Sequence, residues 1–168
     1  MNLQEKKYRV DSFAGIQSKL EAAGATKGRK VVSTHYYGQH DGNDVEKFVE
    51  YADRCEIHIL KANEGKFTLV EHSPIADKDA GYAWLKERGY TRAHIVKMAY
   101  TEYAYKGGTI GLYIIDDFLH SVILYYPPDH HEAMEKEFGL ETAEVISLPY
   151  NKLLAQLGRL RSINLATA

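Results

Sequence analysis

The sequence has one cysteine, Cys55, and only four prolines among its 168 residues. A single cysteine cannot form a disulfide within the chain, so we expect Cys55 to be a small buried residue in a core that holds the fold unaided. No apolar run approaches the roughly 18 residues of a membrane-spanning helix, and the N-terminus lacks the apolar stretch of a signal peptide. We therefore expect a cytoplasmic protein with no membrane partner.

The sequence also lacks an excess of positive charge. Its 21 Lys and Arg residues are outnumbered by 23 Asp and Glu, which gives a formal net charge of −2. Proteins that follow a nucleic acid backbone usually carry a basic excess that neutralises the phosphates. We therefore expect no nucleic acid as the main partner and a small-molecule ligand instead. The sequence leaves a homodimer open.

Tyrosine is the residue that the chain has in abundance, with 13 copies. Its ring is apolar and its hydroxyl is polar, so it suits strands that have one half-hydrated face. Several strand-like runs also carry charged or His residues on one face and apolar residues on the other. A barrel with a polar interior would produce this pattern, and so would the solvent-facing side of an open sheet.

The periodicity of the sequence predicts seven or eight strands, mostly in hairpins, with helices between them. Strands are expected at residues 3–10, 30–39, 54–60, 66–71, 92–106, 109–115, 119–126 and 145–148. Helices are expected at residues 13–23, 77–88, 129–138 and 150–160, with a short helix or an irregular segment at 45–52. Residues 1–160 are expected to form one α+β domain on an antiparallel barrel, followed by a frayed tail at 161–168.

Short motifs occur along the chain in a characteristic order. The first strand contains Leu3-Gln4-Glu5-Lys6-Lys7, the first helix ends in Ala23-Gly24-Ala25, and Pro149-Tyr150-Asn151-Lys152-Leu153-Leu154 lies near the end. Thr34–Gly38 gives an aromatic strand, and Glu56-Ile57-His58-Ile59 opens a central hairpin. Over residues 2–157 this order resembles the CYTH superfamily, the triphosphate tunnel proteins that include class IV adenylyl cyclases and thiamine triphosphatases. The resemblance implies a single-domain antiparallel β-tunnel of about eight strands with flanking helices.

The resemblance also implies a site in which glutamates hold a divalent metal and Arg and Lys hold phosphates. The matching residues retained here are Glu5, Lys7, Lys97 and Asp116, with Arg9 as a further cation. Family residues are replaced by Leu3, Glu56, His58, Val70, Ala99, Leu124 and Tyr126. A triphosphate carries about four negative charges and needs more cations and metal ligands than this set provides. We therefore expect no metal site, and Mg²⁺ or Mn²⁺ only if a residual triphosphate activity persists.

Glu56 and His58 replace arginines of the family pattern and suggest a different chemistry. The two side chains lie two residues apart on a strand, so they point to the same face, which Arg54 continues. A carboxylate beside an imidazole suits general acid–base catalysis, and His titrates near neutral pH. An exposed polar face would explain the pattern equally well. Glu56 and His58 are our candidate catalytic residues.

Other residues are candidates for holding the substrate. Lys7 and Lys97 would bind an anionic group, and aromatic rings such as that of Tyr37 would stack on a planar ligand. The candidate substrate-binding residues are Glu5, Lys7, Arg9, His35, Tyr37, Arg54, Lys97, Asp116 and Tyr126.

The function predicted from these residues is a divergent CYTH-like enzyme that acts on a small anionic or polar organic molecule by general acid–base chemistry. It is not expected to be a triphosphatase, because the retained cations are too few. One alternative is a residual metal-dependent phosphohydrolase or adenylyl cyclase-like activity. The other is a ligand-binding barrel without catalysis.

Overall fold

The computed structural model describes residues 2–168. Within them the strands are β1 (Gln4–Arg9), β2 (Thr26–Gly38), β3 (Val45–Glu50), β4 (Cys55–Asn63), β5 (Lys66–Ile75), β6 (Arg92–Tyr105), β7 (Gly108–Ile115), β8 (Leu119–Tyr126), β9 (Glu144–Ile146) and β10 (Arg161–Asn164). The α-helices are α1 (Ala14–Ala22), α2 (Lys78–Glu87), α3 (His131–Phe138) and α4 (Tyr150–Gln156). Short 3-10 turns cover Pro128–His130 and Leu165–Thr167.

Hydrogen bonding closes eight of the strands into an antiparallel β-barrel. Their order is β6-β2-β3-β4-β5-β1-β8-β7, and β7 pairs again with β6. The two remaining strands attach to this ring, β10 on β6 and β9 on β1. Closing the sheet removes the exposed edges at which other strands would otherwise pair. The predicted fold class, an antiparallel barrel with helices, is confirmed.

The chain divides into two compact units, each described by itself. The first unit comprises the described residues up to 31, residues 63–68 and residues 99–147. The second unit comprises residues 32–62, 69–98 and 148–168. Strands β2, β4, β5 and β6 have residues in both units.

In the first unit, one face of β1 packs against α1 and α3. Tyr8 is fully buried in the apolar cluster that these elements share. The Tyr8 hydroxyl and the Lys6 ammonium both donate to the Glu135 carboxylate of α3, over 2.7 and 2.5 Å. These contacts fix which face of β1 turns towards the helices, so the alternate residues of β1 lie on the other face.

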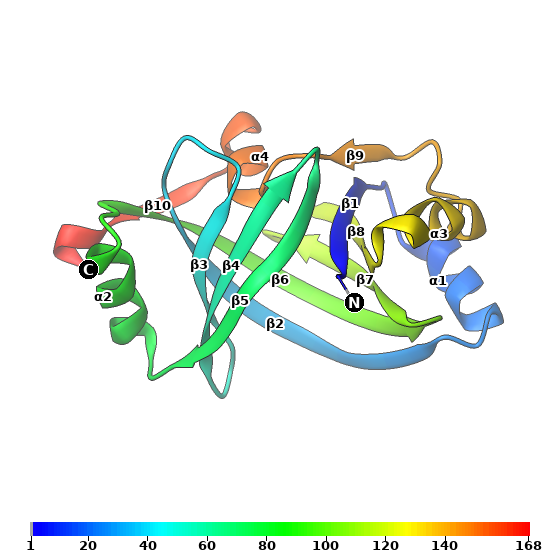
Figure 1. Ribbon diagram of the computed structural model, residues 1–168, viewed down its shortest axis with the longest axis horizontal. Helices are drawn as coiled ribbons and strands as arrows, with labels where there is room; N and C mark the ends of the chain where they lie inside the picture. Colours follow the sequence, from blue (N-terminus) through cyan, green and yellow to red (C-terminus); the bar gives the residue numbers. More distant parts are fainter. Residues whose placement is uncertain (1) are drawn as a thin grey trace. The chain divides into compact units, whose positions relative to one another are not determined.

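In the second unit, α2 lies against β3 (Figure 1). The Asp77 side chain begins this helix by accepting a hydrogen bond from the Ala80 amide. Phe48 is fully buried here, and its ring stacks on Tyr36 with centroids 4.5 Å apart. A Cβ atom at Gly81 of α2 would lie 2.6 Å from the Phe48 ring, so only glycine permits this close approach. The opposite face of β3 and β4 is left for polar side chains.

Three sequence-based expectations about this unit are wrong. Residues 45–50 form strand β3 and not a helix or irregular segment. The strand is buried on both faces, since Val45, Lys47, Phe48 and Val49 are all buried, and so it lacks the alternation that marks a half-exposed strand. The segment at 161–168 does not fray, because β10 pairs with β6 and Leu165 is buried. Helix α4 also ends at residue 156, earlier than expected.

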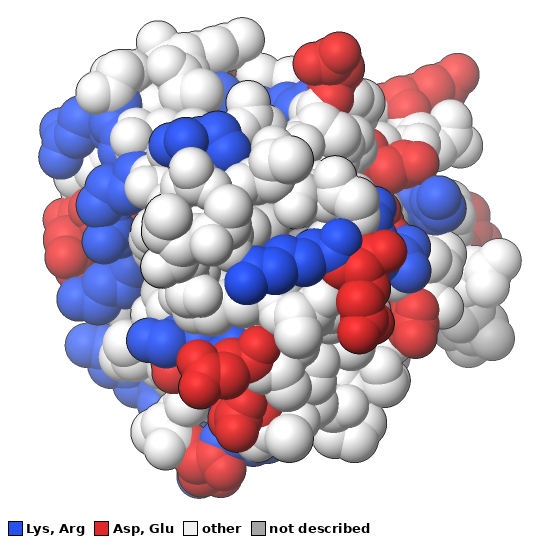
Figure 2. Space-filling model, turned by 90° about the vertical axis from the view of Figure 1, so that its left-hand side faces the viewer, with Lys and Arg blue, Asp and Glu red and all other residues white. Residues whose placement is uncertain are grey.

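The surface carries charges of both signs. On the face shown in Figure 2, Lys and Arg gather along the left edge, and most acidic side chains lie in the lower part and on the right. None of the helices among residues 2–168 has the length and apolar character required to cross a bilayer. Cys55 is buried, as predicted. The cytoplasmic location, the absence of a nucleic acid partner and the possible homodimer stay predictions.

Candidate functional site

Three neighbouring strands of the second unit align a row of polar side chains. His58 of β4 lies opposite Lys47 of β3, and Lys47 lies opposite Tyr37 of β2. Glu56 and His35 flank this row, because both lie opposite Val49 of β3. Paired residues of adjacent strands share a face, so these side chains all lie on the sheet face opposite α2. The shared face of Glu56 and His58, and that of His35 and Tyr37, were predicted for each strand separately and are confirmed.

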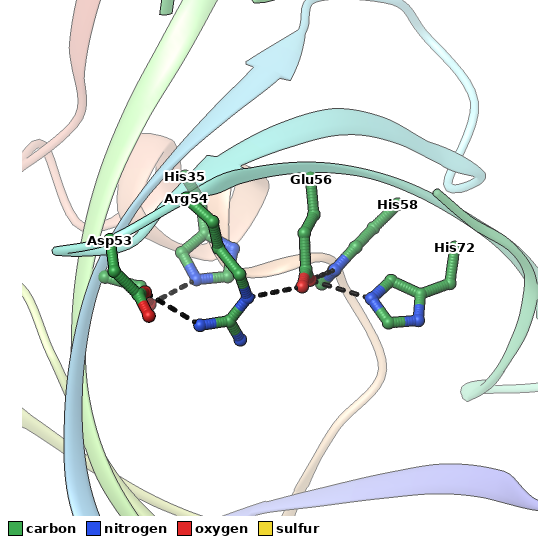
Figure 3. A network of polar contacts seen from close by, with 7 residues as sticks. His35, Asp53, Arg54, Glu56, His58 and His72 are labelled. Carbon is green, nitrogen blue, oxygen red and sulfur yellow. Dashed lines mark hydrogen bonds and ion pairs between the residues drawn. The ribbon is translucent and has the colours of Figure 1, made fainter. Parts of the chain in front are cut away.

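The Glu56 carboxylate is the centre of a hydrogen-bond network on this face (Figure 3). Its Oε1 atom accepts from the Arg54 Nε at 2.7 Å. Its Oε2 atom contacts the His58 Nε2 at 3.0 Å and the His72 Nε2 at 2.7 Å. A carboxylate can only accept, so both imidazoles donate through Nε2 in this arrangement. The second oxygen of Glu56 is thus shared by two histidines from different strands.

The surroundings set the charge of Glu56 and His58. Burial would raise the pKa of Glu56, but the hydrogen bonds from Arg54, His58 and His72 outweigh it and lower that pKa to about 2. Burial, followed by the nearby Lys47 charge, lowers the pKa of His58 to about 4. At neutral pH the Glu56 side chain is therefore charged and the His58 side chain is neutral.

Lys47 and His35 form a more deeply buried part of the same face. The Lys47 side chain is 8% exposed, and its ammonium lies 3.4 Å from the Tyr37 hydroxyl and 4.8 Å from the Tyr37 ring centroid. The His35 Nε2 is hydrogen-bonded to the Ser33 hydroxyl at 2.8 Å. Its Nδ1 atom is buried and has no hydrogen-bond partner within residues 2–168. This nitrogen is a polar atom that a ligand could satisfy.

We expect His35 to make the protein less stable in acid. Burial, then the charges of Lys47 on β3 and His58 on β4, keep the pKa of His35 well below its ordinary value in the folded protein. In the unfolded chain its pKa is about 6.5, so the unfolded state binds more protons as the pH falls below that value. Folding stability should fall by up to about 1.4 kcal/mol per pH unit from this residue alone. Urea unfolding between pH 7 and pH 5 measures how steeply the free energy of unfolding changes with pH.

The His35→Gln variant should show a smaller loss of stability over this pH range. His130→Asn is the matched control, because its side chain is 52% exposed and lies outside the core. If the His35→Gln and wild-type slopes coincided, His35 would not be the source of the acid sensitivity.

The first unit places Glu5, Lys7 and Arg9 together on the face of β1 opposite Tyr8. Lys7 is 3% exposed, and its ammonium lies 4.2 Å from the ring centroid of Phe67. The retained first-strand pattern therefore forms a polar strip within this unit, with Lys7 buried and Glu5 and Arg9 half-buried.

The expected role of Tyr126 beside these residues is wrong. Tyr126 pairs with Gln4 of β1, so it lies on the helix-covered face with Tyr8, and its hydroxyl donates to the Tyr105 carbonyl at 2.6 Å. Tyr125, which pairs with Glu5, takes the position that was assigned to Tyr126. A difference of one residue in a strand exchanges the two faces.

Lys97 and Asp116 lie on other elements than the strands that carry the Glu56 network. Lys97 lies on β6, which is separated from β4 by β2 and β3 in the order of the sheet. Asp116 lies in the turn between β7 and β8, where it and Asp117 have φ angles of 49° and 64°. Asp tolerates this left-handed conformation better than most residues, so the turn gives Asp116 a structural role. Their roles in substrate binding stay predictions.

Sequence reasoning missed Lys47 and His72, for related reasons. Lys47 lies in the segment that was not recognised as a strand, and His72 lies one residue beyond the predicted end of the strand at 66–71. A strand ending at residue 75, as observed, would have brought a second imidazole towards Glu56. The signal available was the hairpin turn at residues 63–65, which pairs β5 with β4.

No family model and no curated protein matches the chain. Solved structures with a similar fold share little sequence with it. The PH1012 protein from Pyrococcus horikoshii OT3 superposes with a TM-score of 0.76 and 16% identity, covering 89% of this chain and 97% of that one. A Vibrio parahaemolyticus protein, provisionally described as an adenylate cyclase, superposes with a TM-score of 0.57 and 16% identity. The match covers 94% of this chain and 87% of that one. A chain of the Schizosaccharomyces pombe Mediator head module superposes with a TM-score of 0.56 and 10% identity, covering 97% of this chain and 100% of that one.

These likenesses concern the fold, since identities of 10 to 16% carry no specific activity. One of the three proteins is described as a cyclase and another belongs to the Mediator head module, so the same fold accompanies different roles. Over residues 2–168 the fold is a closed eight-strand antiparallel barrel with four α-helices. It confirms the β-tunnel of about eight strands with flanking helices that the resemblance to the CYTH superfamily implied.

Proposed function

We propose that the chain binds a small anionic organic molecule on the polar face of the second unit and acts on it by proton transfer. The observation that carries this proposal is the buried Lys47 ammonium beside the unpartnered His35 Nδ1, on the same face as Glu56 and His58. An unsatisfied buried nitrogen such as the His35 Nδ1 is costly without a polar partner. An anionic ligand would supply one.

Lys47 would hold the negative group of this ligand. The Tyr37 ring and hydroxyl lie against the ammonium and would face the ligand as apolar and hydrogen-bonding surface. His35 is neutral and offers its Nδ1 to a donor or acceptor of the ligand. The arrangement selects a small organic anion, because one buried ammonium balances one or two negative charges but not a triphosphate.

His58 would move the proton, with Glu56 as its positioning partner. The contact of 3.0 Å between the His58 Nε2 and the Glu56 Oε2 fixes the ring orientation and leaves Nδ1 as the nitrogen with a free lone pair. A proton taken from the substrate by Nδ1 makes an imidazolium, and the Glu56 carboxylate stabilises its positive charge. The same nitrogen can return the proton to the product, so the enzyme is regenerated without another reactant.

Binding can be tested with succinate, phosphate, pyrophosphate and AMP as probes, by calorimetry. We expect at least one probe to bind, and Lys47→Met to weaken that binding by about 10-fold or more while preserving the length of the buried side chain. Lys61→Met is the matched control, because the Lys61 side chain on β4 is 61% exposed. Equal affinity of wild type and Lys47→Met for every bound probe would remove Lys47 from the site.

A second candidate is the residual metal-dependent phosphohydrolase, favoured by the buried Lys7 and the neighbouring Glu5 in the first unit. Phosphate release from tripolyphosphate, ATP and thiamine triphosphate with Mg²⁺, Mn²⁺ or EDTA tests it. Metal-dependent release that is lost in Lys7→Met would replace our first proposal with this one. Binding of a probe without turnover of any anion would instead favour a non-catalytic ligand-binding barrel.

A further inference from the structure

Glu56, His58 and His72 bring three metal-ligand atoms to one point of the second unit. The Glu56 Oε2 lies 3.0 Å from the His58 Nε2 and 2.7 Å from the His72 Nε2. All three atoms lie within 4.8 Å of one another. We propose that these side chains bind a divalent transition-metal ion, with Zn²⁺ as the representative ligand.

The spacing of the three atoms suits a small tetrahedral ion. Bonds of about 2.0–2.1 Å to zinc place neighbouring ligand atoms about 3.3 Å apart in a tetrahedral site. The two contacts of the Glu56 Oε2 are a few tenths of an ångström shorter, and the two imidazole nitrogens lie within 4.8 Å of each other, so the ion requires a small adjustment of the ligands. The His72 side chain is 53% exposed and has the freedom to make that shift. Each imidazole would coordinate through Nε2 after its proton moves to Nδ1, so no net proton is lost.

The donor set favours one class of metal over another. Two imidazole nitrogens and one carboxylate oxygen are ligands of Zn²⁺ and its transition-metal neighbours, whereas Mg²⁺ and Ca²⁺ prefer oxygen ligands alone. Three protein ligands leave a fourth position of a tetrahedral ion open. The exposure of His72 places that position where water or a small molecule can reach it.

The residues around the cluster hold its ligands in place. Glu56 and His58 lie on one strand and are only 12% and 15% exposed, so the backbone and packing restrict both. The Arg54 Nε donates to the Glu56 Oε1 at 2.7 Å, and the Asp53 carboxylate accepts from Arg54 at 3.0 Å. This outer pair leaves the Oε2 atom directed at the two imidazoles, as partners of metal-binding carboxylates do (Figure 3).

The inference goes beyond the proposed function and does not depend on it. A metal ion needs neither Lys47 nor an organic ligand, and it uses His72, which the proton-transfer proposal leaves aside. With a metal bound, His58 would serve as a ligand and not as a proton acceptor. The two proposals therefore predict different effects for variants of Lys47 and His72.

Metal binding can be measured directly on the tag-free protein after EDTA treatment and dialysis. Calorimetry with Zn²⁺ should show one ion per chain, and Co²⁺ should give the visible absorption of a tetrahedral site. Loss of an outer-shell partner alone commonly weakens metal binding 10- to 100-fold. We therefore expect His72→Asn to weaken Zn²⁺ binding by about 100-fold, and Mg²⁺ to bind far more weakly than Zn²⁺.

His130→Asn is the matched control, because the His130 side chain is 52% exposed, almost the same as that of His72. It should bind Zn²⁺ like wild type, and Lys47→Met should bind it at least as tightly, because that variant removes a positive charge near His58. Circular dichroism checks that each variant is folded. We expect His72→Asn to fold, because the His72 side chain is largely exposed. The proposal is overturned if wild type fails to bind Zn²⁺, or if His72→Asn and Glu56→Gln bind it as tightly as wild type. Anion binding lost in Lys47→Met but kept in His72→Asn would support the proposed function even then.

Discussion

Gly81→Ala is expected to destabilise the protein by about 1–3 kcal/mol, although alanine favours helices. A Cβ atom at residue 81 of α2 would lie 2.6 Å from ring atoms of Phe48. That ring cannot move aside at low cost, because it is fully buried and stacked on Tyr36. The clash should outweigh the gain of about 1 kcal/mol that alanine normally gives over glycine in a helix. Urea unfolding followed by circular dichroism measures the net change.

Gly15→Ala provides the matched control within the same chain. Gly15 also lies in a helix, α1, but a Cβ atom there would have nothing within 4 Å. This variant should be stabilised by about 0.5–1 kcal/mol, since only the backbone preference changes. Stabilisation of similar size at both positions would contradict the close packing of α2 on β3.

Much of the fold could be predicted because its hairpins carry strong local signals. The glycine pair Gly107-Gly108 marks the turn between β6 and β7, and Asn63–Gly65 marks the turn between β4 and β5. Such turns specify antiparallel neighbours directly. Strand β3 gave no such signal, because its buried residues lie on both faces and do not alternate with exposed ones.

The missing strand also explains what was missed in the site. Glu56 and His58 were found together because their spacing of two residues is visible in the sequence. Lys47 is brought to them by the pairing of β3 with β4, which depended on recognising β3 as a strand. Tyr126 was misplaced for a different reason, since the faces of a mostly buried strand such as β8 are not distinguished by polarity. The pairing of β8 with β1 determines which face Tyr126 occupies.

Phe48→Ala is expected to cost about 3–5 kcal/mol of unfolding free energy, the largest effect of any single substitution considered for this core. The ring is fully buried, stacks on Tyr36 and meets the edge of Tyr82 with centroids 5.4 Å apart. Gly81 has no side chain that could fill the space the ring would leave. Val70→Ala on β5 is the control, because Val70 is 53% exposed and its truncation should change stability by no more than about 0.5 kcal/mol.

The changes in unfolding free energy caused by Phe48→Ala and Gly81→Ala should not be additive. Once Phe48 is replaced by alanine, a Cβ atom at residue 81 no longer meets the ring, and the helix preference of alanine can act alone. The Phe48→Ala/Gly81→Ala double variant should therefore be more stable than Phe48→Ala, although Gly81→Ala destabilises wild type. A double-mutant cycle by urea unfolding measures this change of sign. Additive free energies would mean that the glycine and the ring do not contact each other, and the packing of α2 on β3 would need another explanation.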